Sequence, residues 1–424
     1  MSSNSRFIKF IFIFILGINL YGINNDKKMN DSIRHGLFTL MALDAKFQTN
    51  YLKSALLFKT LLKETKKYEY FKQTINMYIL GNDYNQVKYI INKYKNNFPK
   101  HKETLMQEYI YASMMTKDYE DALKVAKDML KQYNSPINYT IIGDIYYAMQ
   151  SYSHAITYYE SSYASKQTLK TLIPLVDILY SYLNKKQKAI SYLETYYRDN
   201  GCNEKVCYRL LRAYMEAQNI DGTISILQTL YKKYKHNHNN LALLKISNLL
   251  VEYLEKKDIN LAIKFLEKNR FDNLKLLALY EKTQNSKKGL KLVRKLYKQT
   301  KNKELLGQIA IFEFDLAKDK KKIMPHVIAN FELALKIKPN PVYENYYGYL
   351  LIEYSIDIKK GLALVEKAVK SNPNNLAFKD SLAWGYYKAH RCKKAKKLMD
   401  EIISKIKYTN PEINKHYDKI QKCK

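Results

Sequence analysis

The sequence contains few residues that interrupt helices, with only 12 Gly and 8 Pro among its 424 residues. Gly and Pro punctuate the turns of sheet-rich folds, so their scarcity argues against an all-β protein. Hydrophobic residues make up 46% of the chain, which is enough to bury a large core. These features favour an all-α fold whose helices are joined by short polar turns.

Cysteine is also scarce, and four residues are too few for a disulfide scaffold in a chain of this length. Cys202 and Cys207 are close enough in sequence to close a small local loop in an oxidising compartment, and the sequence leaves open whether they do. Cys392 and Cys423 have no evident partners. We do not expect a zinc site at Cys202 and Cys207, because structural zinc needs four Cys or His ligands.

Motifs that identify enzymes are missing. The sequence has no Gly-rich loop for phosphate, no nucleophilic Ser between glycines and no helical His pair flanking a Glu. His236 and His238 are the only close His pair, and they lie in a run of Lys and Asn without acidic or Cys ligands. We therefore expect no catalytic residues, no metal and no other cofactor.

Acidic residues are outnumbered, with 40 Asp and Glu against 72 Lys and Arg, which gives a formal net charge of +32. The excess would attract anionic partners. However, the basic residues are mostly Lys and are spread along the whole chain, whereas polyanion-binding proteins usually cluster them and use Arg. A solvated Lys-rich surface is the favoured interpretation, nucleic acid is not expected, and an anionic envelope polymer or membrane surface is the alternative partner.

The first 22 residues have the pattern of a secretory signal. Arg6 and Lys9 accompany an apolar run from Phe10 to Ile18, and a polar stretch follows from Asn24. The run is shorter than the roughly 20 apolar residues of a membrane-spanning helix. Residues 1–22 are thus interpreted as a cleaved signal peptide or an uncleaved N-terminal anchor, and no Cys follows them that could carry a bacterial lipid. We expect an exported protein.

A repeating pattern runs through the rest of the chain. A short polar turn leads to a small residue, and large apolar residues follow at helical spacing. We call the residue at this position the marker residue. Marker residues recur at intervals of 27 to 39 residues with a mean of 34, and the widest departures fall between residues 223 and 327: Ala55, Val87, Ala122, Ala155, Ala189, Thr223, Ala262, Gly289, Val327, Gly361 and Ala395.

A mean period of 34 residues is that of the tetratricopeptide repeat, and individual positions resemble the family's pattern. These include Gly143, Tyr146, Tyr147, Tyr152, Ala155 and Tyr159 in one repeat, and Leu382, Ala383, Tyr386, Tyr387, Ala395 and Leu398 in the last. The resemblance implies an all-α, right-handed superhelical solenoid of about eleven antiparallel helix pairs. A single pair cannot bury its apolar stripe alone, so neighbouring pairs must stack.

The resemblance divides the chain into an N-terminal array at residues 31–235 and a C-terminal array at residues 240–406. The basic, Asn-rich stretch around residues 232–240 is the expected bend between them. Residues 411–424 are expected to form a capping helix and tail that shield the last apolar face.

In this family the first helix of each pair lines an inner groove where partner segments bind. The resemblance therefore implies that the following residues form a partner-binding groove: Gln107, Tyr111, Thr140, Asp144, Tyr147, Tyr208, Arg212, Glu216, Asp380, Trp384, Tyr387 and Lys388. Trp384 stands beside Ala383 and faces either the core or the groove. The Lys and Asn with which heat-shock co-chaperones clamp acidic tails are missing, since Thr140 and Asp144 occupy one such pair of positions.

These features predict a non-enzymatic scaffold or adaptor that binds protein partners in the groove. Together with the export signal, they are similar to bacterial multi-repeat proteins of the cell envelope, and imply a periplasmic or envelope-associated location. The alternative is a Lys-rich protein that binds peptidoglycan, lipopolysaccharide or the membrane surface.

Overall fold

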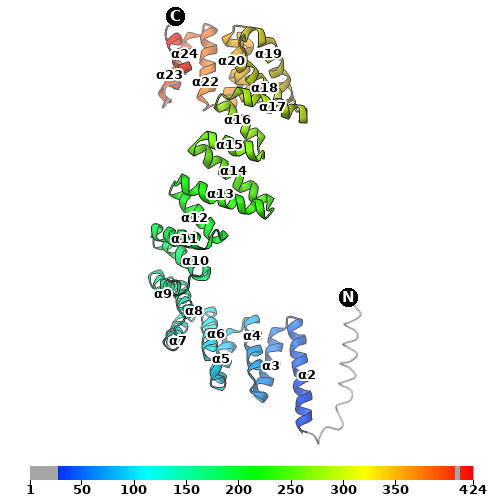
Figure 1. The fold of residues 1–424 in the computed structure, drawn as a ribbon, viewed down its shortest axis with the longest axis vertical. Coiled ribbons are helices and arrows are strands. Elements are labelled where there is room, and N and C mark those ends of the chain that lie inside the picture. The colour runs from blue at the N-terminus through cyan, green and yellow to red at the C-terminus, as the bar shows by residue number, and fades with distance from the viewer. Residues whose placement is uncertain (1–26, 406–410, 424) are drawn as a thin grey trace, which may run out of the picture. The chain divides into compact units, whose positions relative to one another are not determined.

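All regular secondary structure in the described parts of the chain is helical. The computed structural model describes residues 27–405 and 411–423, and no strand occurs among them (Figure 1). The expected all-α fold is confirmed. The segment 1–22, interpreted as a signal or an anchor, lies outside the described residues. Within the described ranges, no helix combines the length and apolar character needed to cross a bilayer.

The helices alternate as first and second members of eleven consecutive pairs. The first helices are α2 (Lys27–Phe47), α4 (Tyr68–Leu80), α6 (Lys102–Met115), α8 (Pro136–Ala148), α10 (Leu169–Asp177) with its π-helical continuation η3 (Ile178–Tyr182), α12 (Glu204–Glu216), α14 (Asn240–Lys257), α16 (Asn273–Lys282), α18 (Leu305–Leu316), α20 (Pro341–Glu353) and α22 (Leu376–Lys388). The second helices are α3 (Tyr51–Thr65), α5 (Tyr84–Tyr94), α7 (Tyr119–Gln132), α9 (Tyr152–Ser165), α11 (Lys186–Asn200), α13 (Ile220–His236), α15 (Ile259–Asn269), α17 (Ser286–Thr300), α19 (Lys320–Ile337), α21 (Ile358–Ser371) and α23 (Cys392–Lys405).

Three short elements complete the fold. Two 3₁₀ turns, η1 (Lys95–Asn97) and η2 (Pro99–His101), join α5 to α6. The last helix, α24 (Pro411–Gln421), packs against α22 and α23 and buries Ile413, His416 and Ile420. It therefore covers an apolar surface at the end of the last pair.

The marker residues set the packing of each pair. All eleven lie in second helices, one in each pair, and all are buried. The backbones of α20 and α21 approach each other closely, because a Cβ added to Gly361 would lie 2.8 Å from the carbonyl oxygen of Gly348. A larger side chain would hold these two helices apart. The tetratricopeptide-like solenoid expected from the 34-residue period is confirmed.

The turns between paired helices repeat as well. In nine pairs, one non-Gly residue in the turn has a left-handed backbone conformation, five or six residues before the marker residue: Thr49, Asn82, Lys117, Gln150, Asn184, Gln218, Gln284, Ser355 and His390. Around Gln150, the Ser151 N–H donates to the Tyr146 carbonyl (2.8 Å), as in a Schellman helix end. The two exceptions are the pairs α14/α15 and α18/α19. Each contains an 18-residue helix, α14 or α19, and these long helices account for the long marker intervals.

Contacts divide the chain into two compact units within α13. Unit 1 extends to Leu230 and unit 2 begins at Tyr231. The core of unit 1 includes a cluster around Phe58 and Phe71, and the core of unit 2 includes clusters around Phe331 and Met399.

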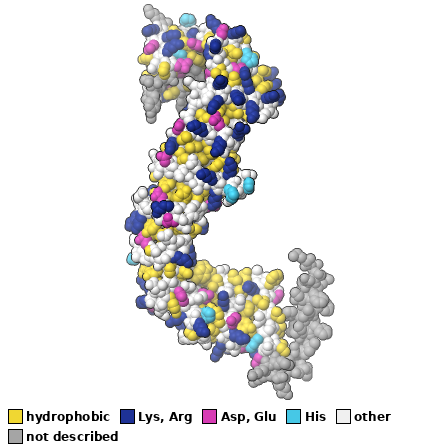
Figure 2. All heavy atoms as spheres, viewed as in Figure 1, with side chains coloured by type: hydrophobic (Ala, Val, Ile, Leu, Met, Phe, Trp, Pro, Cys, Tyr) yellow, Lys and Arg dark blue, Asp and Glu magenta, His cyan; other side chains and the backbone are white. Residues whose placement is uncertain are grey.

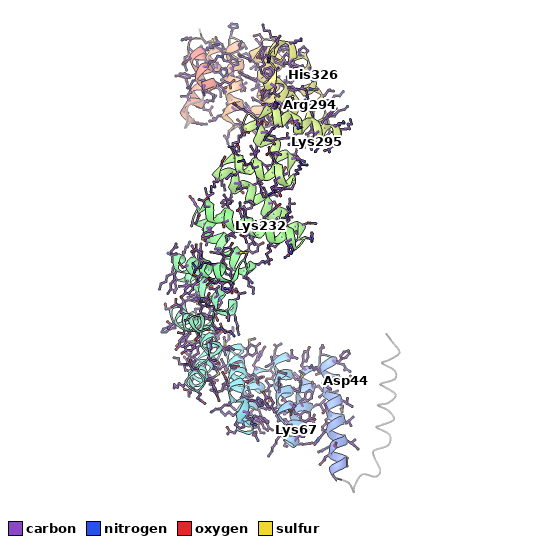
Figure 3. All side chains as sticks on the ribbon, viewed as in Figure 1. Asp44, Lys67, Lys232, Arg294, Lys295 and His326 are labelled. Atoms are coloured by element: carbon purple, nitrogen blue, oxygen red, sulfur yellow. A yellow bond between two sulfur atoms is a disulfide. The ribbon has the colours of Figure 1, made fainter. Side chains whose placement is uncertain are left out.

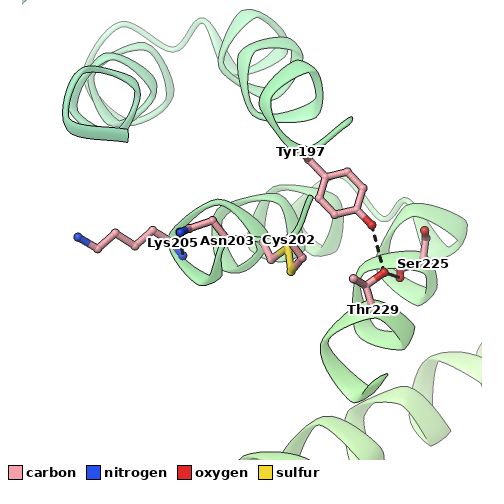
Figure 4. Close-up of a disulfide and its surroundings, with 7 residues drawn as sticks. Tyr197, Cys202, Asn203, Lys205, Ser225 and Thr229 are labelled. Carbon is pink, nitrogen blue, oxygen red and sulfur yellow. Dashed lines mark hydrogen bonds between the residues drawn. A yellow bond between two sulfur atoms is a disulfide. The ribbon is translucent and has the colours of Figure 1, made fainter. Parts of the chain in front are cut away.

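All four cysteines form disulfides. Cys202 bonds to Cys207 at the start of α12 (Figure 4), and Cys392 bonds to Cys423. The expectation that Cys392 and Cys423 lack partners is wrong. The two cysteines are 31 positions apart in sequence: α23 begins at Cys392, and the chain returns after α24 to the beginning of α23. Because this return depends on helix packing, local spacing gave no sign of the bond.

Candidate partner-binding surfaces

Successive first helices of unit 1 are joined side by side. The Gln107 amide in α6 donates to Asn138 Oδ1 in α8 (2.9 Å). The Arg209 guanidinium in α12 donates two hydrogen bonds, both 2.7 Å, to the carboxylate of Asp177 in α10. Thr140 in α8 and Thr171 in α10 also share a hydrogen bond (3.2 Å), so α6, α8, α10 with η3, and α12 form a continuous layer, which we call the first-helix wall.

Exposed tyrosines are concentrated on this wall. The sequence has 40 Tyr, yet in the described ranges only five have large exposed fractions. Four of these occupy four consecutive first helices: Tyr111 in α6, Tyr147 in α8, Tyr182 in η3 and Tyr208 in α12, with exposed fractions of 38 to 48%. The fifth exposed tyrosine, Tyr89, lies on a second helix, α5. We call the four the tyrosine row.

The centre of the row is an aromatic cluster. The Tyr182 ring is 6.2 Å from Tyr147 in an edge contact and is stacked on Tyr152 at 4.1 Å. Tyr182 lies in the wider π-helical turn that follows α10, a helix with Pro174 in its interior. Hydrogen bonding between Tyr147 and Tyr182, together with burial, raises the pKa of the Tyr147 phenol. The Tyr147 phenol therefore stays protonated at neutral pH and can donate a hydrogen bond to a partner.

A charged cluster adjoins the row on α12. The Glu216 carboxylate accepts hydrogen bonds from the Tyr180 hydroxyl (2.6 Å) and the Arg212 guanidinium (2.8 Å), and Lys186 Nζ lies at 3.5 Å. These donors lower the pKa of Glu216 to about 2. The carboxylate is thus ionised across the physiological pH range, and its ion pair with Arg212 holds Arg212 in place beside the row.

The structure sorts the predicted groove residues of unit 1 into two groups. Tyr111, Tyr147, Tyr208, Arg212 and Glu216 are exposed or border the exposed surface. The remaining three serve the packing of the wall. Gln107 bridges α6 to α8, and Asp144 accepts a 2.6 Å hydrogen bond from Tyr159. Burial raises the pKa of Asp144.

Thr140 belongs to the interior. Its side chain is buried and forms a hydroxyl cluster with Ser162 of α9 (2.8 Å) and Thr171 of α10 (3.2 Å). Its predicted place in the groove is therefore not realised in this structure, because two neighbouring helices close over it.

In unit 2, two predicted groove residues are likewise buried. Asp380 accepts hydrogen bonds from His416 of α24, at 2.9 Å to its Oδ2. Trp384, the only tryptophan, is 2% exposed and stacks on His416 at 4.3 Å and on Tyr387 at 4.9 Å. Sequence register placed both on the inner face, and the structure adds α24, which covers them.

Tyr387 and Lys388 remain partly exposed beside Trp384. Lys388 Nζ lies over the Trp384 ring, 5.5 Å from its centroid, and donates to the backbone carbonyl of Glu353 (3.3 Å). These two residues therefore border the surface near α20.

A pocket of about 470 Å³ opens on the first-helix face of unit 2 between α18, α20, α22 and α24. We call it the acidic pocket. Its walls include the rings of Phe314, Tyr346, Tyr349 and Tyr354 and the carboxylates of Glu353, Asp380 and Glu412. Neither Lys nor Arg is among the described residues that line it. Of these residues, only Asp380 was predicted from the sequence to line a binding site.

The repeat register contained a signal for two of the missed residues. Tyr346 stands 34 residues before Asp380, and Glu353 stands 34 before Tyr387, so they occupy the same positions one repeat earlier. Glu412 carried no such signal, because its contact with the Tyr349 hydroxyl (2.8 Å) depends on how α24 folds back.

On the face drawn in Figure 2, the positive charge of the described residues does not gather into one patch. Figure 2 shows Lys and Arg side chains scattered over the visible faces of both units. Lys67, Lys232 and Lys295 in Figure 3 are examples that are exposed at widely separated positions in the sequence. The described residues also contain no group of three or more His, Cys, Asp or Glu able to hold a metal ion.

Comparisons with known proteins were made for sequence and for structure. No protein-family model matches the sequence. No curated protein sequence is detectably similar.

Three solved structures illustrate the likeness in fold. The Cut9–Hcn1 hetero-tetramer of the APC/C matches 91% of this chain and 96% of its own at 11% identity and a TM-score of 0.36. The P58(IPK) TPR domain matches 76% of this chain and 98% of its own at 14% identity and a TM-score of 0.27. PilF of Pseudomonas aeruginosa matches 50% of this chain and 95% of its own at 14% identity and a TM-score of 0.34. The architecture rests on the repeated helix pairs themselves.

Proposed function

We propose that this tetratricopeptide-like chain is a non-enzymatic scaffold that binds a protein partner along the first-helix wall of unit 1. The observation that carries the proposal is the tyrosine row. Tyr is enriched at protein interfaces, where it buries a large apolar ring and also offers a hydrogen-bonding hydroxyl. Among the described residues, most Tyr are packed in the interior or partly covered, and four of the five exposed ones occupy successive first helices.

The wall is also rigid enough to serve as a recognition surface. Tyr147 and Tyr182 contact each other, and the double hydrogen bond between Asp177 and Arg209 holds the adjacent helices in register. Side chains that are ordered before binding lose little further conformational entropy when a partner arrives. A row fixed in this way suits an extended or helical partner segment that contacts several repeats at once.

We place the protein in the bacterial cell envelope, as an exported adaptor. The apolar run from Phe10 to Ile18 supports export, and so does the pairing of all four cysteines, because disulfides persist in oxidising compartments such as the periplasm. The proposed binding surface begins at α6 and contains none of residues 1–22, which are either cleaved or kept as an anchor.

A second candidate function is binding of an anionic envelope polymer through Lys-rich outer surfaces. The formal net charge of +32 favours it, and the scattered distribution of the lysines disfavours a dedicated site. The two functions respond differently to salt. Contacts between exposed charges are screened as ionic strength rises, whereas contacts through buried rings are much less affected.

The test is recovery of partners crosslinked to the full chain in the cell envelope, washed at low and at high salt. A protein partner retained at high salt would support the scaffold. Loss of all partners at high salt, with only acidic polymer or lipid recovered at low salt, would support the polyanion function and overturn the proposal.

A further inference from the structure

We propose that the acidic pocket of unit 2 binds the guanidinium group of an arginine on a partner polypeptide. The inference rests on the proposed function in one respect only, that the partner is a protein. It concerns a different unit and a different chemistry from the tyrosine row.

The first observation is charge. In a chain with a formal net charge of +32, this pocket presents three carboxylates and no basic side chain among its described lining residues. Asp380 is paired with His416, but Glu353 forms no ion pair with Lys or Arg of the described chain. Its Oε2 accepts the Trp384 indole N–H at 2.7 Å, and Oε1 is left to accept from a ligand. An incoming cation would balance this charge.

The second observation is an unused acceptor. The Oδ1 atom of Asn345 is buried at the pocket wall and has no hydrogen-bond partner. Buried polar atoms in folded proteins are nearly always hydrogen-bonded, so an unpaired acceptor on a residue that lines a pocket points to a donor supplied by a ligand. A ligand that places N–H groups in the pocket would satisfy Asn345 and Glu353 together.

The third observation is the shape and chemistry of the walls. Four aromatic rings, of Phe314, Tyr346, Tyr349 and Tyr354, line the pocket. Burial and the nearby Asp315 raise the pKa of the Tyr346 phenol, and burial and Glu412 raise that of Tyr349, so both hydroxyls stay neutral. Aromatic faces attract cations, and a planar guanidinium stacks on them while its N–H groups point to acceptors at the edge. Lysine has the charge without this planar geometry.

The occupant is inferred to be part of a polypeptide because the pocket is open along one face of the unit. Its lining comes from four helices, and that face continues the layer formed by α18, α20 and α22. Two lysines, Lys388 and Lys419, lie over the Trp384 ring at 5.5 and 5.3 Å, yet neither lines the pocket. Because Trp384 is hydrogen-bonded to the pocket residue Glu353, these two positive charges lie near the pocket and disfavour a small polycation more than a single arginine presented by a neutral segment.

Trp384 can report ligand binding at the pocket through its fluorescence. Trp384 is the only tryptophan and is hydrogen-bonded to Glu353, a pocket carboxylate. The fluorescence of Trp384 in the full chain should therefore change when Glu353 engages a ligand. The probe is the neutral-flanked peptide acetyl-Gly-Gly-Arg-Gly-Gly-amide, titrated to millimolar concentration. The comparison peptide carries citrulline, which has the shape of arginine without its charge. Calorimetry on the same samples checks the optical signal.

Two substitutions localise the binding. Glu353→Gln keeps an acceptor for the Trp384 indole but removes the charge, and should weaken the arginine peptide at least about tenfold. The matched control is Glu366→Gln, which removes an exposed carboxylate that accepts a Tyr386 hydroxyl on the second helix α21 and should leave binding unchanged. Asn345→Leu should bind the arginine peptide less tightly. Its free energy of unfolding should not fall, because the substitution removes a buried atom that has no hydrogen-bond partner.

We expect the wild type to bind the arginine peptide saturably and at least tenfold more tightly than the citrulline peptide. This binding should be lost in Glu353→Gln and kept in Glu366→Gln. Equal binding of the arginine and citrulline peptides, or unchanged binding by Glu353→Gln, would overturn the inference. So would spermidine binding at least as tightly as the arginine peptide, because the pocket would then be a site for a small polycation. None of these outcomes depends on the tyrosine row, so failure here leaves the proposed function standing.

Discussion

The indole N–H of Trp384 donates a 2.7 Å hydrogen bond to Glu353 Oε2, and this bond joins two successive first helices, α22 and α20. Trp384 is 2% exposed, whereas Glu353 lies at the wall of a pocket. The pair thus connects the covered end of unit 2, under α24, to the surface where we infer that a partner's arginine is bound.

Loss of this bond should destabilise the protein. In Trp384→Phe, Glu353 would lose its donor and the buried site would lose volume, so the free energy of unfolding should fall by about 2–4 kcal/mol. Glu353→Gln keeps an acceptor for the indole and should cost about 1 kcal/mol. Urea denaturation followed by circular dichroism measures both. Equal costs for the two variants would show that the bond contributes little.

The close packing of α20 against α21 predicts whether a Gly-to-Ala substitution stabilises or destabilises the protein. Ala normally stabilises a helix relative to Gly by up to about 1 kcal/mol. Gly36→Ala, in the middle of α2 with open space around it, should show this gain. Gly361→Ala should instead lower the free energy of unfolding by about 1–3 kcal/mol, because its Cβ would meet the backbone of Gly348. A stabilising effect of Gly361→Ala would contradict the packing role of the marker residues.

The two disulfides should differ in their effect. Cys392–Cys423 closes a 31-residue separation and ties α24 to α23, whereas Cys202–Cys207 spans only five residues. Replacing Cys392 and Cys423 with Ala should lower the free energy of unfolding by about 2–4 kcal/mol, and replacing the other pair should lower it less. Thermal unfolding of the two double variants tests this.

Alkylation of protein purified from the envelope should find no free thiol, and four free thiols would contradict the export proposal.

Glu216 makes a pH-dependent contribution. Its pKa is about 2 in the folded chain against an ordinary 4.5, because Tyr180, Arg212 and Lys186 donate to the carboxylate. Between these values the unfolded state binds a proton that the folded state does not, so this stabilisation is full above 4.5 and is lost as the pH falls towards 2. The difference in stability between the wild type and Glu216→Gln should therefore be smaller at about pH 3 than at about pH 6. A difference that does not change with pH would show that the carboxylate is not held ionised by these donors.

The sequence predicted the repeat because its physical causes are local. Each pair needs a small residue where its helices cross, and the turn before it recurs at nearly constant distance, as Gln150 precedes Ala155 and His390 precedes Ala395. The irregular spacings between residues 223 and 327 also have local causes. The 18-residue helices α14 and α19 lengthen two intervals, and the 11- and 10-residue helices α15 and α16 shorten the one between them.

The candidate sites were harder to predict because they depend on neighbours distant in sequence. Register alone put Thr140 and Trp384 on the inner face, and packing against α10 and α24 buried them. The acidic pocket draws residues from Phe314 to Ile413, and one of its four walls is α24, whose position no repeat pattern specifies. The tyrosine row was found in part, through Tyr111, Tyr147 and Tyr208. Tyr182 was missed because the helix changes to π geometry just before it.

The most direct test of the account compares partner recovery by two matched sets of tyrosine variants. The double variant Tyr147→Ala/Tyr182→Ala removes the centre of the tyrosine row, and Tyr89→Ala removes an equally exposed Tyr, at 49%, from a second helix. Both should fold as the wild type does, because the side chains are on the surface. At high salt, the account predicts that the double variant loses the crosslinked protein partner and that Tyr89→Ala keeps it. Full recovery by the double variant would contradict the central claim that this wall is the binding surface.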